Sequence, residues 1–140
     1  MMKTTLCRSA VILVVVSALG AIAACSGPDL PDHERVSDRA QARWDALVDK
    51  DGKTAWNYYT PGFRDTYPQP DFDYDIRRRP VRWLDAEVRG ADCQEDRCTV
   101  RVWVEYDAPS APQGQRSVKL SKVVSEEWLK LDGQWWYAEE

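Results

Sequence analysis

Four cysteines are the residues with the greatest capacity for covalent chemistry, and the sequence places them in two groups. Cys7 and Cys25 belong to an apolar N-terminal stretch, whereas Cys93 and Cys98 enclose the short segment QEDR. A thioredoxin-like redox site is disfavoured because four residues, instead of two, separate the second pair. A zinc site is disfavoured because no further pair of Cys or His completes four ligands. In an oxidising compartment the second pair most simply forms a disulfide, so we predict a structural bond between Cys93 and Cys98.

The N-terminal stretch predicts an export signal. Lys3 and Arg8 precede an uncharged run at residues 10–24, AVILVVVSALGAIAA. This run is shorter than the roughly 20 residues that a membrane-spanning helix needs. It is closed by the tetrapeptide IAAC, which ends at Cys25 and resembles the bacterial lipobox. By that resemblance residues 1–24 are a lipoprotein signal peptide, and cleavage leaves an acylated cysteine at the new N-terminus.

The lipobox resemblance also implies where the protein resides. Cys25 would carry a diacylglyceryl thioether and an N-acyl chain such as palmitate, and two or more acyl chains anchor a protein stably in a membrane. Residues 25–33 would form a lipidated tether and residues 34–140 a single domain. Ser26 resembles the residue that sends lipoproteins to an outer membrane, facing the periplasm, if the source has two membranes. Ordinary cleavage with a free or disulfide-bonded Cys25 stays an alternative.

The charge balance argues against nucleic acid as a partner. The chain has 23 acidic and 19 basic residues and a net charge of −4, whereas nucleic-acid-binding domains usually carry basic patches. Its seven Trp and six Tyr supply a sizeable aromatic core. We expect no nucleic-acid partner, no cofactor and no bound metal.

The segment DFDYDIRRR contains alternating aspartates that look like the opening of a calcium loop. The sixth position of that loop would be Ile76, where glycine is needed for the turn, and the twelfth would be Arg82, where a bidentate glutamate is needed. Calcium is therefore rejected. The alternation instead predicts an extended segment with Phe72, Tyr74 and Ile76 facing inward and the aspartates facing water.

Acid–base catalysis has few candidate residues. The one histidine, His33, belongs to the predicted tether, so nucleophile–histidine systems and histidine-based dehydration are disfavoured. An aspartate base with tyrosine donors remains as an alternative. Its candidate residues are Tyr58, Tyr59, Tyr67, Asp65 and Tyr106.

The elements that would position these side chains follow from hydrophobic periodicity. Residues 33–49 predict a helix with one apolar face, formed by Val36, Ala40, Trp44, Leu47 and Val48. Residues 53–59 predict a second, shorter helix. Residues 80–92, 98–107, 116–131 and 134–139 predict strands, separated by turn and loop sequences. The third strand is long enough that we expect it to bend near residues 121–125.

The first predicted hairpin requires a β-bulge. If Cys93 opposes Cys98 and pairing continues without a break, each face of the hairpin mixes apolar and charged residues. One extra residue at Gly90 separates the two kinds of residue, and we therefore predict a bulge there. Trp83 and Trp103 then lie together on the otherwise polar face.

Two segments carry a resemblance to a known family. RWDALVDKDGKTAWNYYTPGFR and EEWLKLDGQWWY look like the opening and the last hairpin of nuclear transport factor 2-like (cystatin-like, SnoaL-like) domains. Together they bracket residues 39–137. The resemblance implies an α+β fold in which N-terminal helices pack on a strongly curved antiparallel sheet and form a cone. Within this family the chain is most similar to small bacterial envelope lipoproteins.

The resemblance implies a non-catalytic binding or interaction module anchored in the cell envelope. The expected pocket or interface residues are Trp56, Tyr59, Tyr106, Trp83 and Trp103. The expected partners are the membrane, through Cys25, and either a second copy or another envelope protein on the sheet face, because relatives often dimerise there. The alternative is a small-molecule acid/base enzyme of the ketosteroid isomerase or dehydratase type that uses Asp and Tyr in the cone.

Replacement of Cys25 tests the predicted anchor. We expect Cys25→Ser to abolish metabolic labelling with a fatty acid and to release the protein from membranes, because the acylated thiol is lost. Cys7→Ser is the matched control and should leave both measurements unchanged. A Cys25→Ser variant that is still labelled would contradict the lipobox assignment.

Overall fold

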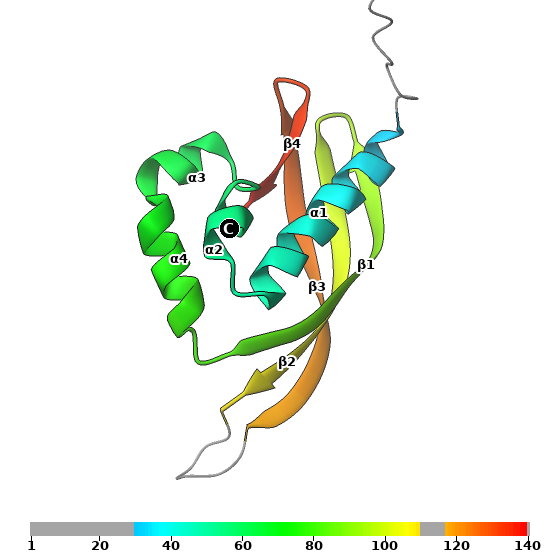
Figure 1. Ribbon diagram of the computed structural model, residues 1–140. Helices are drawn as coiled ribbons and strands as arrows, with labels where there is room; N and C mark the ends of the chain where they lie inside the picture. The colour runs from blue at the N-terminus through cyan, green and yellow to red at the C-terminus, as the bar shows by residue number, and fades with distance from the viewer. Residues whose placement is uncertain (1–29, 110–116, 140) are drawn as a thin grey trace, which may run out of the picture.

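Four helices precede four strands in the part of the chain that the structure describes (Figure 1). The computed structural model describes residues 30–109 and 117–139, so the predicted signal peptide, Cys25 and most of the tether lie outside the described residues. The helices are α1 (Asp32–Val48), α2 (Gly52–Trp56), α3 (Pro61–Thr66) and α4 (Gln69–Arg78). The strands are β1 (Arg82–Gln94), β2 (Arg97–Ala108), β3 (Val118–Leu131) and β4 (Gln134–Ala138).

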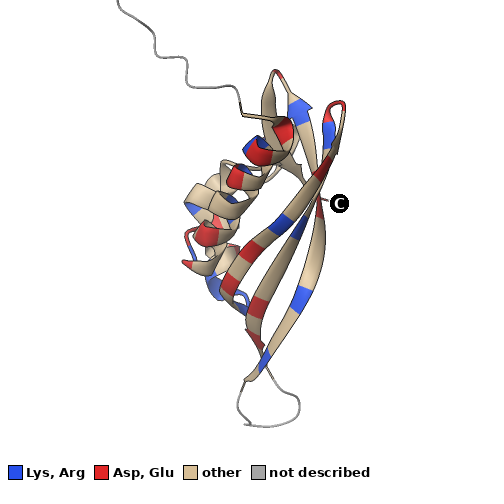
Figure 2. Ribbon diagram, turned by 90° about the vertical axis from the view of Figure 1, so that its right-hand side faces the viewer, with Lys and Arg blue, Asp and Glu red and all other residues tan. Residues whose placement is uncertain are grey.

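The four strands form one sheet in the order β1-β2-β3-β4, and each neighbouring pair is antiparallel. The long strands curve, α1 runs across the face on their inner side, and the other helices lie on that same side (Figure 1). Figure 2 shows the two layers edge-on, with the outer face of the sheet free of helices. The structure thus confirms the predicted α+β class. None of the described helices is long and apolar enough to span a membrane.

Helix α1 buries the apolar stripe that its sequence predicts. The stripe consists of Val36, Ala40, Trp44 and Leu47. The helix begins at Asp32, whose carboxylate accepts hydrogen bonds from Lys130 Nζ at 3.1 Å and from Trp135 Nε1 at 3.2 Å. The bond from Lys130, assisted by the bond from Trp135, holds the pKa of Asp32 below its usual value. The start of α1 is therefore tied to β3 and β4.

The first hairpin contains the predicted β-bulge and the predicted disulfide. Cys93 and Cys98 face each other with their Cα atoms 4.0 Å apart and are bonded. Pairing then continues as far as Gly90, where the register shifts by one residue before Val88 meets Val102. The shift keeps the apolar residues of both strands on the helix side of the sheet.

A second register shift, which the sequence analysis did not predict, lies between Trp83 and Asp85. It reverses the face of the residues before it, so Trp83 pairs with Tyr106 and its ring centroid lies 5.2 Å from that of Trp44 on α1. The prediction that Trp83 shares the outer, polar face with Trp103 is therefore wrong. Of the two, Trp103 keeps the predicted position.

The prediction of an extended segment after residue 68 is also wrong, because residues 69–78 form α4. Phe72 and Ile76 are buried, whereas Tyr74 is 56% exposed. Residues four apart share a helix face and residues two apart share a strand face, so Phe72 and Ile76 fit both patterns. The second predicted helix is shorter than expected and ends at Trp56, and the sequence analysis did not predict α3.

Helices α2 and α4 approach so closely at Gly52 that no larger residue fits. A Cβ atom at Gly52 would lie 2.5 Å from Asp73 Cα, whereas a Cβ atom at Gly62 in α3 would meet nothing within 4 Å. We expect Gly52→Ala to lower the free energy of unfolding by about 1–3 kcal/mol through overpacking. Gly62→Ala, the matched control, should be neutral or stabilise by about 0.5–1 kcal/mol. Urea denaturation of both variants checks this, and equal midpoints would contradict the close approach.

Candidate functional site

A buried ion pair joins helix α1 to strand β3 inside the cone. Arg43 Nη1 lies 2.8 Å from Glu126 Oε1, and both side chains are only 5% exposed. Glu126 faces inward because β3 pairs with β2 without a register shift, which places Glu126 opposite the buried Val100. A charge that is removed from water must be paired and hydrogen-bonded, and the surrounding side chains supply the further bonds.

Two indoles complete the environment of the Glu126 carboxylate. Trp44 Nε1 donates to Oε1 at 2.7 Å, and Trp128 Nε1 donates to Oε2 at 3.2 Å. On the other side, Arg43 Nη2 donates to the Tyr59 hydroxyl at 2.9 Å, and the Arg43 guanidinium lies 3.7 Å from the ring centroid of Tyr137. The carboxylate therefore accepts three N–H bonds, and the guanidinium lies against aromatic rings.

Burial and the arginine charge act in opposite directions on the two tyrosines. Burial raises the pKa of Tyr137 to about 12, and it also raises the pKa of Tyr59, although Arg43 opposes both changes. Burial alone would lower the pKa of Arg43, but Tyr59, Glu126 and Tyr137 outweigh it and hold that pKa above its usual value. At neutral pH the Arg43 guanidinium is therefore charged and both phenols are neutral, so the phenols can donate hydrogen bonds.

A hollow of about 200 Å³ lies directly against the ion pair. Its apolar lining consists of Trp44, Leu47, Trp83 and Val124. Its polar lining includes the phenols of Tyr59 and Tyr137 together with Arg79 and Glu139. Because the Tyr59 hydroxyl already accepts a bond from Arg43, its own hydrogen is left to donate to a bound molecule.

The structure separates the candidate residues that the sequence analysis grouped together. Tyr59 and Trp83 line the hollow. Tyr106 packs against Trp83 with ring centroids 5.5 Å apart but does not line it. Trp56 lies elsewhere and donates its indole N–H to a backbone carbonyl, and Trp103 lies on the outer face of the sheet.

The candidate aspartate base and tyrosine donors of the acid–base alternative do not lie together in one site either. The Tyr67 hydroxyl donates to Asp75 in α4, and Asp65 is exposed on α3. The only described carboxylates that line the hollow are Glu126 and Glu139. No group of three or more His, Cys, Asp or Glu side chains that could hold a metal occurs in residues 30–109 and 117–139.

The sequence analysis missed Arg43, Glu126 and Tyr137. Arg43 follows Ala40 by three positions and precedes Trp44 by one, so it borders the apolar stripe of α1. Glu126 has the same strand parity as Trp128 and therefore points to the same face. These spacings indicate that Arg43 and Glu126 face the core. They were not used because charged residues are almost never fully buried unless they are paired.

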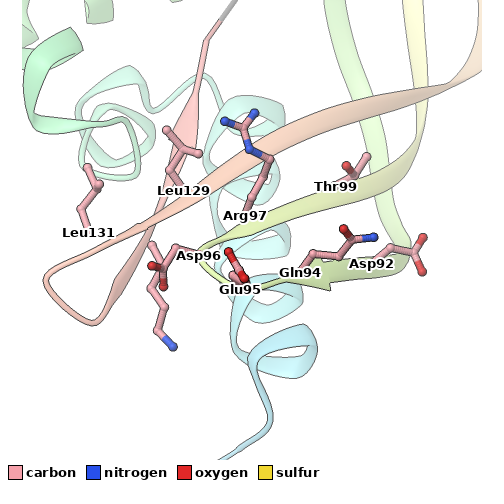
Figure 3. A pocket seen from close by; sticks show the side chains of 9 residues that line it. Asp92, Gln94, Glu95, Asp96, Arg97, Thr99, Leu129 and Leu131 are labelled. Carbon is pink, nitrogen blue, oxygen red and sulfur yellow. The ribbon is translucent and has the colours of Figure 1, made fainter.

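A larger hollow of about 1030 Å³ lies at the tip of the β1–β2 hairpin, next to the end of β3 (Figure 3). Three of its charged side chains already have partners: Asp92 pairs with Arg101 at 3.0 Å, Arg97 with Glu127 at 3.7 Å, and Lys130 with Asp32 at 3.1 Å. Most of its lining residues are exposed or half-buried. We place the candidate site at the smaller hollow because that one combines buried polar groups with an apolar wall.

Solved structures with a similar backbone have low sequence identity. A SEC-C motif containing protein from Rhodopseudomonas palustris is 19% identical, with a TM-score of 0.54 over 72% of this chain and 73% of that chain. A protein from Campylobacter jejuni described as an NTF2-like transpeptidase is 14% identical, with a TM-score of 0.50 over 74% of this chain and 96% of that chain. A SEC-C motif containing protein from Psychrobacter arcticus is 10% identical, with a TM-score of 0.56 over 80% and 63% of the two chains.

No protein-family model and no curated protein matches the sequence. The shared backbone arrangement, and not sequence identity, is what relates these chains. The protein therefore has the nuclear transport factor 2-like (NTF2-like) fold.

Replacing one partner of the buried ion pair should lower the free energy of unfolding more than replacing both partners. We expect Arg43→Met or Glu126→Leu alone to lower the free energy of unfolding by about 3–5 kcal/mol, because each leaves an uncompensated buried charge. The double variant should recover most of this loss, which urea denaturation in a double-mutant cycle measures. The exposed pair Arg89–Glu87 (50% and 57% exposed) is the control, and its coupling should stay below about 1 kcal/mol. Additive losses at Arg43 and Glu126 would contradict the pairing.

Proposed function

We propose that this protein is a lipid-anchored binding module of the bacterial cell envelope that holds a small molecule at the open end of its cone. The proposal rests on the hydrogen bonds and the position of the Glu126 carboxylate. Its carboxylate accepts bonds from Arg43, Trp44 and Trp128, yet it lies at the wall of an accessible hollow. A site with a fixed polar base and an apolar wall is suited to hold a ligand.

The same observation favours binding over the acid/base alternative. A general base must reach the proton that it removes and must be free to accept it. Three N–H donors already occupy the Glu126 carboxylate, and Glu139 is exposed near the C-terminus. His33 is exposed in the first turn of α1 and is not among the residues that line the hollow.

The lining of the hollow indicates the chemical class of the ligand. A volume of about 200 Å³ is below the roughly 300–1,000 Å³ of pockets for drug-sized molecules, so the ligand is small. The wall of Trp44, Trp83 and Val124 favours an apolar body. The neutral phenols of Tyr59 and Tyr137 favour a hydrogen-bond acceptor, such as a carbonyl or ether oxygen, on that body.

The proposed anchor supports a role at the membrane surface. If Cys25 is acylated, six residues separate it from the start of α1 at Asp32. Such a tether spans about 20 Å when extended, which would hold the cone close to the lipid surface. The proposed location is the cell envelope, in the outer membrane facing the periplasm if the source has two membranes.

Two neighbouring valines on β3 provide a matched test of the cone site. Val124 lines the hollow, whereas Val123 points to the outer face and is 59% exposed. We expect the protein extracted from membranes to retain a small molecule, detected by native mass spectrometry. Val124→Trp should abolish this retention because the indole fills the hollow, and Val123→Trp should not. Equal retention by both variants would place the ligand outside the cone.

The outer sheet face is a second candidate, and the exposure of Val123 favours it. Trp103 is the partner of Val123 on β2, so the two lie side by side on the face that no helix covers (Figure 2). This face would bind a second copy or another envelope protein. Chemical crosslinking of the same two variants tests this: loss of crosslinked species in Val123→Trp, but not in Val124→Trp, would assign association to this face.

A further inference from the structure

Two arginines from distant segments lie against one tryptophan. The Cζ atom of Arg39 in α1 is 5.3 Å from the ring centroid of Trp136 in β4, and the Cζ atom of Arg64 in α3 is 4.7 Å from the same centroid. Arg39 also lies 4.9 Å from the ring of Tyr58, and Arg64 lies 5.2 Å from the ring of Trp56. We call these five residues the arginine–aromatic cluster. None of them lines the hollow inside the cone.

The positive charge of this cluster has no counterpart in the described chain. Within residues 30–109 and 117–139, no carboxylate oxygen forms an ion pair within 4.0 Å of Arg39 or Arg64. The Nε atom of Arg64 is buried and has no hydrogen-bond partner there. Burial, together with the charge of Arg64, lowers the pKa of Arg39. Two like charges thus lie against one ring in a partly desolvated place, which is unfavourable without a compensating anion.

Two other arginines that lie on aromatic rings have a carboxylate partner, whereas Arg78, 4.9 Å from the ring of Tyr74, forms no ion pair within the described residues. Arg43 lies on Tyr137 and has Glu126 as its partner at 2.8 Å. Arg89 lies 5.7 Å from the ring of Trp103 and has Glu87 at 3.0 Å. In both cases the chain itself supplies the carboxylate. The cluster thus lacks a carboxylate partner among the described residues, which leaves a place for an anion that they do not supply.

We propose that the arginine–aromatic cluster binds a phosphate group that carries two negative charges, either inorganic phosphate or a phosphate monoester. Two guanidinium groups match such a dianion in charge, and arginine forms paired hydrogen bonds to phosphate oxygens. Arg39 is held in place because its Nε donates to the carbonyl oxygen of Trp135 at 2.7 Å and its Nη1 donates to the amide oxygen of Gln134 at 2.6 Å, which leaves Nη2 for the ligand. Both guanidinium groups also lie against the ring of Trp136 in β4.

The test is a titration of the purified protein with inorganic phosphate, followed by calorimetry and by the NMR signals of the indole N–H groups. We expect saturable binding that shifts the signals of Trp136 and Trp56 but not that of Trp103. Arg64→Gln should weaken binding about tenfold or more, because a charge-assisted bidentate contact is lost. Arg89→Gln, which removes an arginine that is stacked on Trp103 but already paired, should leave phosphate binding unchanged.

The pH dependence of phosphate binding is a second measurement, and arginines with only a structural role would not produce it. The second pKa of a phosphate monoester is about 6 and that of inorganic phosphate is higher, so both are mainly monoanions at about pH 5, and binding should be weaker there than at about pH 7.5. Sulfate keeps both charges over this range, and its binding should stay constant. No histidine belongs to the arginine–aromatic cluster, so the expected pH dependence comes from the phosphate.

Glycerol 3-phosphate distinguishes the two sources of the phosphate group. Tighter binding than that of inorganic phosphate indicates a monoester, and equal binding indicates the free ion. Arg64→Lys keeps the charge but loses the planar fork, and it serves as a folded comparison if the glutamine variant loses structure. Absence of saturable binding at millimolar phosphate, or unchanged affinity in both Arg64 variants, would overturn the proposal.

Discussion

The ion pair between Arg43 and Glu126 is the constraint on which the interior of the cone depends. It joins α1 to β3 across the concave face, and both side chains are only 5% exposed. Such a pair is costly to desolvate, and its attraction repays that cost only when further hydrogen bonds satisfy both partners. Trp44 and Trp128 bond to the carboxylate, and Tyr59 bonds to the guanidinium. The aromatic residues around the pair are therefore fixed by polar bonds as well as by packing.

This constraint also determines what the neighbouring hollow can do. The carboxylate in its wall is engaged, so proton transfer would require the ion pair to open first. The phenols of Tyr59 and Tyr137 remain neutral because burial raises their pKa values. What the hollow offers to a ligand is an apolar wall and two hydrogen-bond donors, and these groups act without changing their protonation state. The proposed binding would thus use the same contacts that stabilise the fold.

Much of the fold could be predicted because strands and bulges leave a signature in the alternation of residues. The Gly90 bulge was predictable because the disulfide fixes the register and only one inserted residue separates apolar from charged side chains. The second register shift, between Trp83 and Asp85, was not predictable, because a large aromatic residue at the end of a strand fits either face of the sheet. Helix α4 was missed because Phe72 and Ile76 satisfy both the helical and the extended period.

The site was less predictable than the fold, because sequence patterns treat charged residues as exposed. Arg43 and Glu126 contradict that rule only because tryptophans supply donors to a buried carboxylate. Trp44, Trp128, Trp56 and Trp135 each donate the indole N–H to an oxygen of another residue. A chain of this size with seven tryptophans can thus bury charge where an aliphatic core of the same volume would leave it unpaired. The abundance of tryptophan, which the sequence analysis took only as a source of apolar area, is the feature that permits a charged interior.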